Sequence, residues 1–215
     1  LDPEELEQVF QTYHALCAEA ARPFAGVLAH TRGAEVLLYF GYPQAYEDAA
    51  RRAVHAGLDI VHASRVLQAR LLEQYGVSVG VKLGVHTGLV VMTPAGEVQH
   101  TAPLAIGALP YLTMRLVAAA PPETLVVSGA IWQLVQGYFL GQALGELTLG
   151  GMVTPVQGYR ILQATGARTR LEATAPQQLT PFVGRERELA LAQWRHIEAR
   201  SDGGHPQRVH DIRAL

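Results

Sequence analysis

Nine histidines and one cysteine are the side chains of this sequence best suited to binding a transition metal. The histidines show no ligand spacing, such as two histidines on adjacent turns of one helix face. Cys17 stands alone, so it can form neither an intramolecular disulfide nor a cysteine-rich zinc site. His86, in the phrase GVHTG, lies at the end of an expected strand, where a lone histidine usually has a structural role. The sequence therefore indicates no metal centre built on histidine or cysteine.

Arg115 and Tyr111 form a second pair of polar residues, within the phrase LPYLTMRL. Residues four positions apart lie on one face of a helix. We therefore expect the guanidinium and the phenol to be neighbours on a helix over residues 108–119. Taken alone, this pattern also fits an arginine in a surface or interface ion pair.

A third stretch, TRGAEVLLYFGYP at residues 31–43, begins with an unusual turn. Gly33-Ala34-Glu35 stands where a tight hairpin favours Asn-Gly or Asp-Gly. Either a functional residue is missing from this turn or the turn is loose, and the stretch alone does not decide. Glu35 carries the only carboxylate of the turn, and a residue one step along a hairpin generally faces the other way.

The elements that position these residues alternate between helices and strands, in the order αββαβ(β)αβαββ. Hydrophobic periodicity predicts a first helix from Asp2, a β-hairpin around Gly33, and a long amphipathic helix over residues 46–73. Later strands are expected around the phrases VSVGVKLGVHTGLVVM, TLVVS, YFLGQALGELTL and VQGYRILQA, with a turn at residues 94–96. This order is typical of an α+β sandwich with helices packed on a mostly antiparallel sheet.

Both long helices carry recognisable start signals. Asp2, Pro3 and Glu5 fit a capping box, in which Asp2 satisfies backbone N–H groups and does not bind a metal. Cys17 lies on the apolar stripe of this helix and is expected in the core. Glu47 and Asp48 give the second helix an acidic start that suits its dipole.

The composition sets the class of protein. The chain is 49% hydrophobic and 17% charged, which is ordinary globular usage. A formal net charge of -2 does not indicate binding to nucleic acid or to an anionic membrane. No stretch is apolar for the roughly 20 residues of a membrane span, and the N-terminal residues lack a signal-peptide pattern. We expect a soluble protein in a reducing, cytoplasmic setting.

Several phrases occur together in a recognisable order: LLYFGYPQAYEDAARRAVHAGLDIV, GVHTGLVV, AIGALPYLTMRL, TLVVSGAIWQLV and LGELTLGGMVTPVQGYRIL. Together they resemble the class III adenylate/guanylate cyclase homology domain, in the bacterial branch where it precedes an AAA-type ATPase. The resemblance covers residues 1–163 and implies a ferredoxin-like sheet with helices packed on it. Residues 164–180 are expected to be a linker. Residues 181–215, with LTPFVGREREL and a helix at about 185–200, look like the start of the ATPase module without its P-loop.

The resemblance implies a degenerate metal site. The family's hairpin usually reads Gly-Asp-Gly, and its aspartate is one of two carboxylates that hold a pair of Mg or Mn ions against a nucleoside triphosphate. Here that position is Ala34, so we expect no metal cofactor. The other carboxylate lies on a first strand upstream of the first helix, and this chain begins at Leu1-Asp2-Pro3, so that strand is expected to be missing. A missing central strand would leave an unpaired sheet edge that favours self-association.

The remaining site positions are also carried over from the family. Arg115 matches the arginine that stabilises the transition-state phosphate, and Tyr111 replaces the asparagine that orients the ribose. Tyrosine donates one hydrogen bond and cannot reproduce the paired donor and acceptor of an amide. Leu28 and Leu104 occupy the places of purine-selecting polar side chains, and Gly33 lies beside the expected nucleotide.

Three hypotheses remain open from the sequence. The first is a catalytically inactive cyclase-like domain that acts as a regulatory or dimerisation module in signal transduction, as a homodimer or with another cyclase-homology domain. The second is an active nucleotidyl cyclase that makes cyclic AMP or GMP when a partner or a missing segment complements it. The third is a non-functional fragment of a longer regulator. Under the first hypothesis, a nucleoside triphosphate binds weakly at best.

Overall fold

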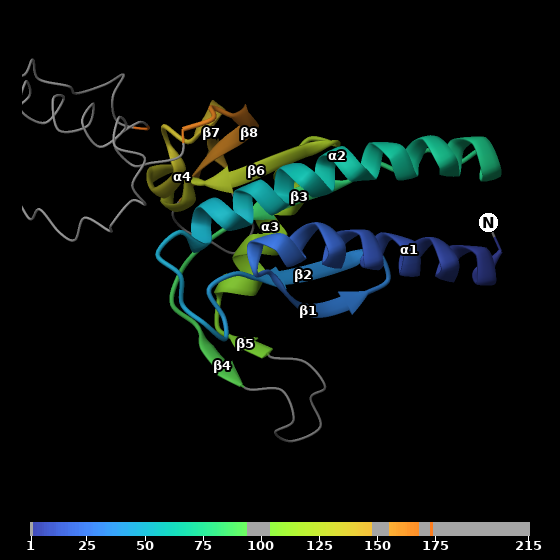
Figure 1. Cartoon of the computed structure of the whole chain (residues 1–215), viewed down its shortest axis with the longest axis horizontal. Coiled ribbons are helices and arrows are strands. Elements are labelled where there is room, and N and C mark those ends of the chain that lie inside the picture. The colour runs from blue at the N-terminus through green and yellow to red at the C-terminus, as the bar shows by residue number, and fades with distance from the viewer. Residues whose placement is uncertain (1, 94–103, 148–154, 168–172, 174–215) are drawn as a thin grey trace, which may run out of the picture. The chain divides into compact units, whose positions relative to one another are not determined.

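The computed structural model describes residues 2–93, 104–147, 155–167 and 173 (Figure 1). The chain divides into two compact units, Leu1–Ala173 and Thr174–Leu215. The second unit, with the expected ATPase start at 181–215 and its helix at 185–200, lies outside the described residues, as does most of the expected linker. Within the part that is described, no helix combines the length and the apolar character needed to cross a bilayer.

A four-stranded mixed sheet forms the centre of the first unit. Its strands are β3 (Lys82–Val85), β6 (Thr124–Ser128), β8 (Val156–Ala164) and β7 (Phe139–Leu147), in that spatial order. β3 and β6 pair in parallel, whereas β6 with β8 and β7 with β8 pair antiparallel. All five residues of β6 are buried, which is expected of a strand covered on both faces.

Helices cover both faces of this sheet. Successive side chains of a strand point to opposite faces, and β6 shows this alternation directly. Leu125 and Val127 belong to a core cluster with residues of α2 (Ala49–Tyr75) and α4 (Gly129–Val135). Val126 instead packs with Leu116 of α3 (Leu109–Ala119) in a second cluster. The expected α+β architecture of helices on a sheet is therefore confirmed.

A separate hairpin lies beside the first helix. α1 (Pro3–Ala21) has the predicted capping box, with Asp2 and Glu5 bonding reciprocally, and it is followed by η1 (Arg22–Phe24). α1 packs along α2 and against the hairpin β1 (Val27–Arg32) and β2 (Glu35–Tyr39) (Figure 1). Cys17 is buried as predicted. Among the described residues, this hairpin forms its own two-stranded sheet.

β4 (Val91–Thr93) and β5 (Leu104–Ile106) form a second small hairpin. The two strands pair antiparallel, and Val91 is the direct partner of Ile106. Tyr39 links this hairpin to β2, because its hydroxyl accepts a 3.0 Å hydrogen bond from the backbone N–H of Ala105. The expected turn at residues 94–96 lies outside the described residues.

Two sequence expectations differ from the structure in detail. The long helix begins at Ala49, and Asp48 precedes it without capping a backbone N–H. Its carboxylate bonds to Arg51 and Arg52, an ion-pair role that the sequence did not indicate. The strand expected from residue 77 pairs only over Lys82–Val85.

Candidate functional site

The turn between β1 and β2 carries Ala34. Arg32 is the register partner of Glu35, so Gly33 and Ala34 form a two-residue turn. Gly33 has a φ of 56°, in the left-handed region that glycine adopts readily. His14 of α1 lies 2.7 Å, through Nε2, from the Gly33 carbonyl oxygen and holds the turn against the helix. The exposed Ala34 side chain is a methyl group, which offers no ligand to a cation.

Glu35 is the first residue of β2 and is exposed. Glu35 pairs with Arg32 in the strand, so its carboxylate is not at the turn position that Ala34 occupies. Over the described residues, no group of three or more histidine, cysteine, aspartate or glutamate side chains is arranged to hold a metal ion.

Arg115 and Tyr111 lie together on the exposed face of α3, as their spacing predicts. The Arg115 NH2 group donates a 2.7 Å hydrogen bond to the Tyr111 hydroxyl oxygen. The guanidinium carbon also lies 4.9 Å from the centre of the Tyr111 ring. Tyr111 therefore occupies part of the hydrogen-bonding capacity of Arg115, and a bound phosphate would have to compete with it.

The other predicted site residues lie on different elements. Leu28 is in β1 opposite Leu38, and Leu104 begins β5 opposite Thr93. α3 packs against β3, β5 and β6, whereas the hairpin with Ala34 packs against α1. Thus the structure brings Arg115 and Tyr111 together and places Ala34 on an element with different packing partners.

His86 is held by a serine at the end of the neighbouring strand. It follows β3, and Ser128 ends β6, so the parallel pairing brings both to the same edge of the sheet. His86 Nδ1 lies 2.8 Å from the Ser128 hydroxyl oxygen. That oxygen also accepts a 3.5 Å hydrogen bond from the Ile131 N–H and caps α4. Ser128 is only 1% exposed, so this pair connects strand and helix and does not form an accessible nucleophile.

Acidification should weaken the fold through His86. Burial lowers the pKa of His86 below its ordinary value of about 6.5. The unfolded chain therefore binds more protons than the folded chain below that pH, and stability present above about pH 6.5 is lost as the pH falls. We expect the urea midpoint to decrease between pH 7.5 and 5.5, and His86→Gln to reduce this decrease.

The control for this experiment is His62→Gln, because His62 is exposed on α2. It should keep the pH dependence of the parent protein. An equal pH dependence of the urea midpoint in the parent and in His86→Gln would contradict the prediction that His86 causes the loss of stability at low pH.

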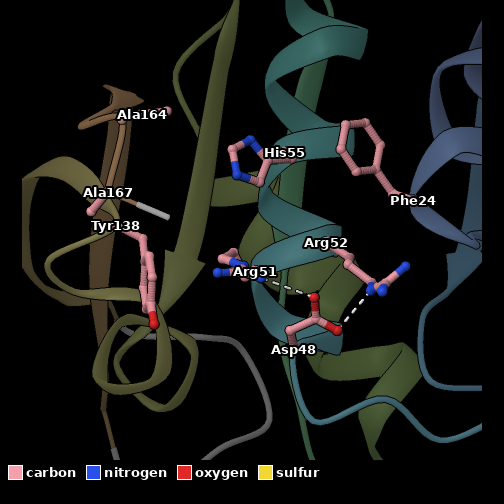
Figure 2. Close-up of a pocket in the computed structure, with 9 residues that line it drawn as sticks. Phe24, Asp48, Arg51, Arg52, His55, Tyr138, Ala164 and Ala167 are labelled. Atoms are coloured by element: carbon pink, nitrogen blue, oxygen red, sulfur yellow. Dashed lines mark hydrogen bonds and ion pairs between the residues drawn. The ribbon is translucent and has the colours of Figure 1, made fainter. Parts of the chain in front are cut away.

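A cavity of about 410 Å³ lies beside the beginning of α2. Tyr138, which precedes β7, and Ala164, the last residue of β8, also line it. Figure 2 shows Arg51, Arg52 and Asp48 at this cavity. The sequence interpretation missed it and assigned Asp48 to the helix dipole. The available signal was the spacing of Asp48, Arg51, Arg52 and His55, which places polar side chains on adjacent turns of one helix.

Comparisons with known proteins identify the fold. The guanylyl cyclase Cya2 is 22% identical, with a TM-score of 0.73 over 79% of this chain and 86% of that chain. The adenylyl cyclase CyaB from P. aeruginosa is also 22% identical, with a TM-score of 0.70 over 76% of this chain and 85% of that chain. A dimeric guanylyl cyclase domain of the RhoGC fusion protein from Blastocladiella emersonii is 16% identical, with a TM-score of 0.63 over 76% and 86% of the two chains.

The chain therefore has the fold of class III adenylyl and guanylyl cyclase domains, as the sequence resemblance predicts. No family model matches the sequence. A curated protein of Rhizobium meliloti, itself uncharacterized, is 24% identical over 190 residues. That match covers 88% of this chain, and this chain spans 18% of the length of that relative.

Proposed function

We propose that this chain is a catalytically silent cyclase-like domain that acts as a dimerisation and regulatory module in signal transduction. The observation that supports this most directly is the methyl group of Ala34 in the β1–β2 turn, where the resemblance expects a metal-binding aspartate. The proposal places the domain in the cytoplasm, where a buried free thiol such as Cys17 stays reduced. Relay to an AAA-type ATPase remains a prediction from residues 181–215.

The chemistry of cyclisation explains why Ala34 matters. The ribose 3′-oxygen would attack the α-phosphorus while pyrophosphate leaves, and paired cations stabilise both the attacking and the leaving oxygen. A methyl group provides neither charge nor lone pairs. Arg115 remains, but its NH2 group bonds to the Tyr111 hydroxyl. The retained fold without this carboxylate favours a binding role over a catalytic one.

An exposed apolar surface supports the association part of the proposal. Val91 and Ile106, 68% and 53% exposed, are direct partners in the β4–β5 hairpin, so their side chains lie on one face of it. α3 packs against β5 and adds further exposed side chains. We propose that the exposed apolar side chains of the hairpin and of α3, with Leu89 just before β4, act together, and we call them the α3–hairpin surface; its members are Leu89, Val91, Ile106, Tyr111 and Met114. Contiguous exposed apolar patches mark protein interaction sites. The cyclase domain of RhoGC, which has this fold, has been crystallised both as a non-canonical dimer and as a monomer.

We expect the purified chain to self-associate through the α3–hairpin surface, and Ile106→Glu to shift it toward monomer. A buried unpaired carboxylate at an interface costs enough to weaken association by about tenfold or more. Sedimentation velocity over a concentration series measures the change in dissociation constant.

Val66→Glu is the matched control, since Val66 on α2 is also 53% exposed but lies outside this surface. It should associate like the parent chain. A well-folded parent that remains monomeric at high micromolar concentration would refute the association, and equal weakening by both substitutions would refute the surface.

A further inference from the structure

The cavity beside α2 contains none of the residues discussed as a cyclase site. Its lining comes from four parts of the first unit: Phe24 of η1, the beginning of α2 with Asp48 before it, the residue before β7, and the end of β8 with the segment that follows it. Figure 2 shows Tyr138 facing α2 across the cavity, with Ala164 and Ala167 on the side of Tyr138. Its volume of about 410 Å³ falls in the range of small-molecule sites. The described residues that line it are Phe24, Asp48, Arg51, Arg52, His55, Tyr138, Ala164, Gly166 and Ala167.

Among the described side chains that line this cavity, Arg51, Arg52 and Asp48 carry charge. Asp48 Oδ2 lies 3.1 Å from an Arg51 NH2 group, and Asp48 Oδ1 lies 2.7 Å from Arg52 Nε. One carboxylate thus faces two guanidinium groups (Figure 2). Hydrogen bonding from Arg52, together with Arg51, holds the pKa of Asp48 below its ordinary value. The side chains of all three residues are about 30% exposed, so solvent and ligands reach them.

Aromatic side chains form another part of the walls. The Arg51 guanidinium lies 5.0 Å from the centre of the Tyr138 ring, so it lies against an aromatic face. The rings of Phe24 and His55 stack at 5.7 Å with an angle of 7° between their planes. Burial, with a contribution from Arg51 and against an opposing one from Asp59, lowers the pKa of His55 and so favours its uncharged form. The cavity therefore offers cationic groups for an anion and uncharged rings for a planar apolar body.

We propose that this cavity binds a small organic anion in which a carboxylate or phosphate group is attached to a flat unsaturated ring. The planar fork of an arginine matches both kinds of oxyanion and also stacks on rings. Asp48 already binds both guanidinium groups, so the oxyanion of a ligand would compete with its carboxylate. The ring would contact Tyr138 and the His55 side of the cavity. The site does not depend on the cyclase-like role of the chain.

The test is ligand-dependent thermal stabilisation followed by calorimetric titration. Benzoate and phenyl phosphate should each raise the melting temperature, and the stronger of the two identifies the preferred oxyanion. Benzamide, which has the ring without the charge, and inorganic phosphate, which has the charge without the ring, should produce little shift. Binding should weaken as salt increases, since the contact is partly ionic.

Two substitutions should change the affinity in opposite directions. Arg51→Gln removes a guanidinium and should weaken binding by about tenfold. Asp48→Asn removes the internal carboxylate that competes for both arginines and should tighten binding. Arg70→Gln on the exposed part of the same helix is the matched control and should bind like the parent. Circular dichroism checks that each variant is folded.

Four results would overturn the proposal. The first is no stabilisation of the parent by either aromatic anion. The second is equal stabilisation by benzamide, because the charge would then be irrelevant. The third is equal weakening by Arg51→Gln and Arg70→Gln. The fourth is weaker binding in a folded Asp48→Asn variant.

Discussion

Purified protein incubated with ATP or GTP and magnesium or manganese is expected to form no measurable cyclic nucleotide, whether monomeric or dimeric. The β1–β2 turn presents Ala34, where the resemblance to the cyclase family expects an aspartate that holds a cation. Loss of a single preorganised group at a reacting centre typically costs about 10²–10³ in rate. Tyr111, where the resemblance expects an asparagine, should add a penalty of similar order, since it also bonds to Arg115.

Three variants make this result informative. Arg115→Ala is the comparison for any trace of product: robust product from the parent chain that disappears in this variant would overturn the assignment of catalytic silence. Ala34→Asp alone should not recover activity, because the resemblance requires a second carboxylate. Tyr111→Phe removes the hydroxyl that accepts the Arg115 bond but keeps the ring. The Tyr111→Phe variant should also remain inactive. Activity in this variant would show that the Tyr111 hydroxyl by itself prevents Arg115 from acting in catalysis.

Leu125→Ala should have the largest effect on stability. Leu125 is 1% exposed and lies in the central strand β6, within the cluster that joins α2 and α4 to the sheet. Removing its side chain loses buried apolar contacts and leaves a cavity, which costs about 2–5 kcal/mol. Gly57 of α2 approaches the Leu125 methyl groups so closely that a side chain on Gly57 would collide with them. The helix therefore packs directly on this leucine, and we expect a clear decrease of the urea midpoint.

Leu134→Ala provides the matched control for that experiment. Leu134 lies in α4 but is 58% exposed, so its truncation should change the free energy of unfolding by no more than about 0.5 kcal/mol. Similar midpoints for the two variants would show that the β6 core is not the centre of stability.

Local signals account for the parts of the fold that were predicted well from the sequence. Asp2 and Glu5 form the predicted capping box, because the residues that bond are three apart in sequence. The TLVVS phrase forms β6, since a short apolar run of β-branched residues fits a strand buried on both faces. The helix predicted at 46–73 spans Ala49–Tyr75, and its N-cap residue Asp48 bonds through its side chain to Arg51 and Arg52 and to no backbone N–H of the helix.

The candidate sites likewise include contacts that local sequence spacing predicts and contacts that depend on the tertiary fold. The Tyr111–Arg115 contact was predictable, since four-residue spacing on a helix determines it. The cavity beside α2 was not, because Tyr138 reaches Arg51 only after β7 and β8 pack near α2. No sequence pattern indicated that Ser128 would hold His86, because that contact depends on the parallel register of β3 and β6.

That parallel register has a consequence for the order of folding. β7 and β8 follow one another along the chain and pair as an antiparallel hairpin, so their contacts close a short loop. β3 and β6 instead bring together segments such as His86 and Ser128, which are 42 residues apart, with α3 between them. Closing a longer loop costs more chain entropy, and such contacts form slowly. We expect the β7–β8 hairpin to form early and β3 to join β6 late, so the edge that carries His86 becomes ordered near the end of folding.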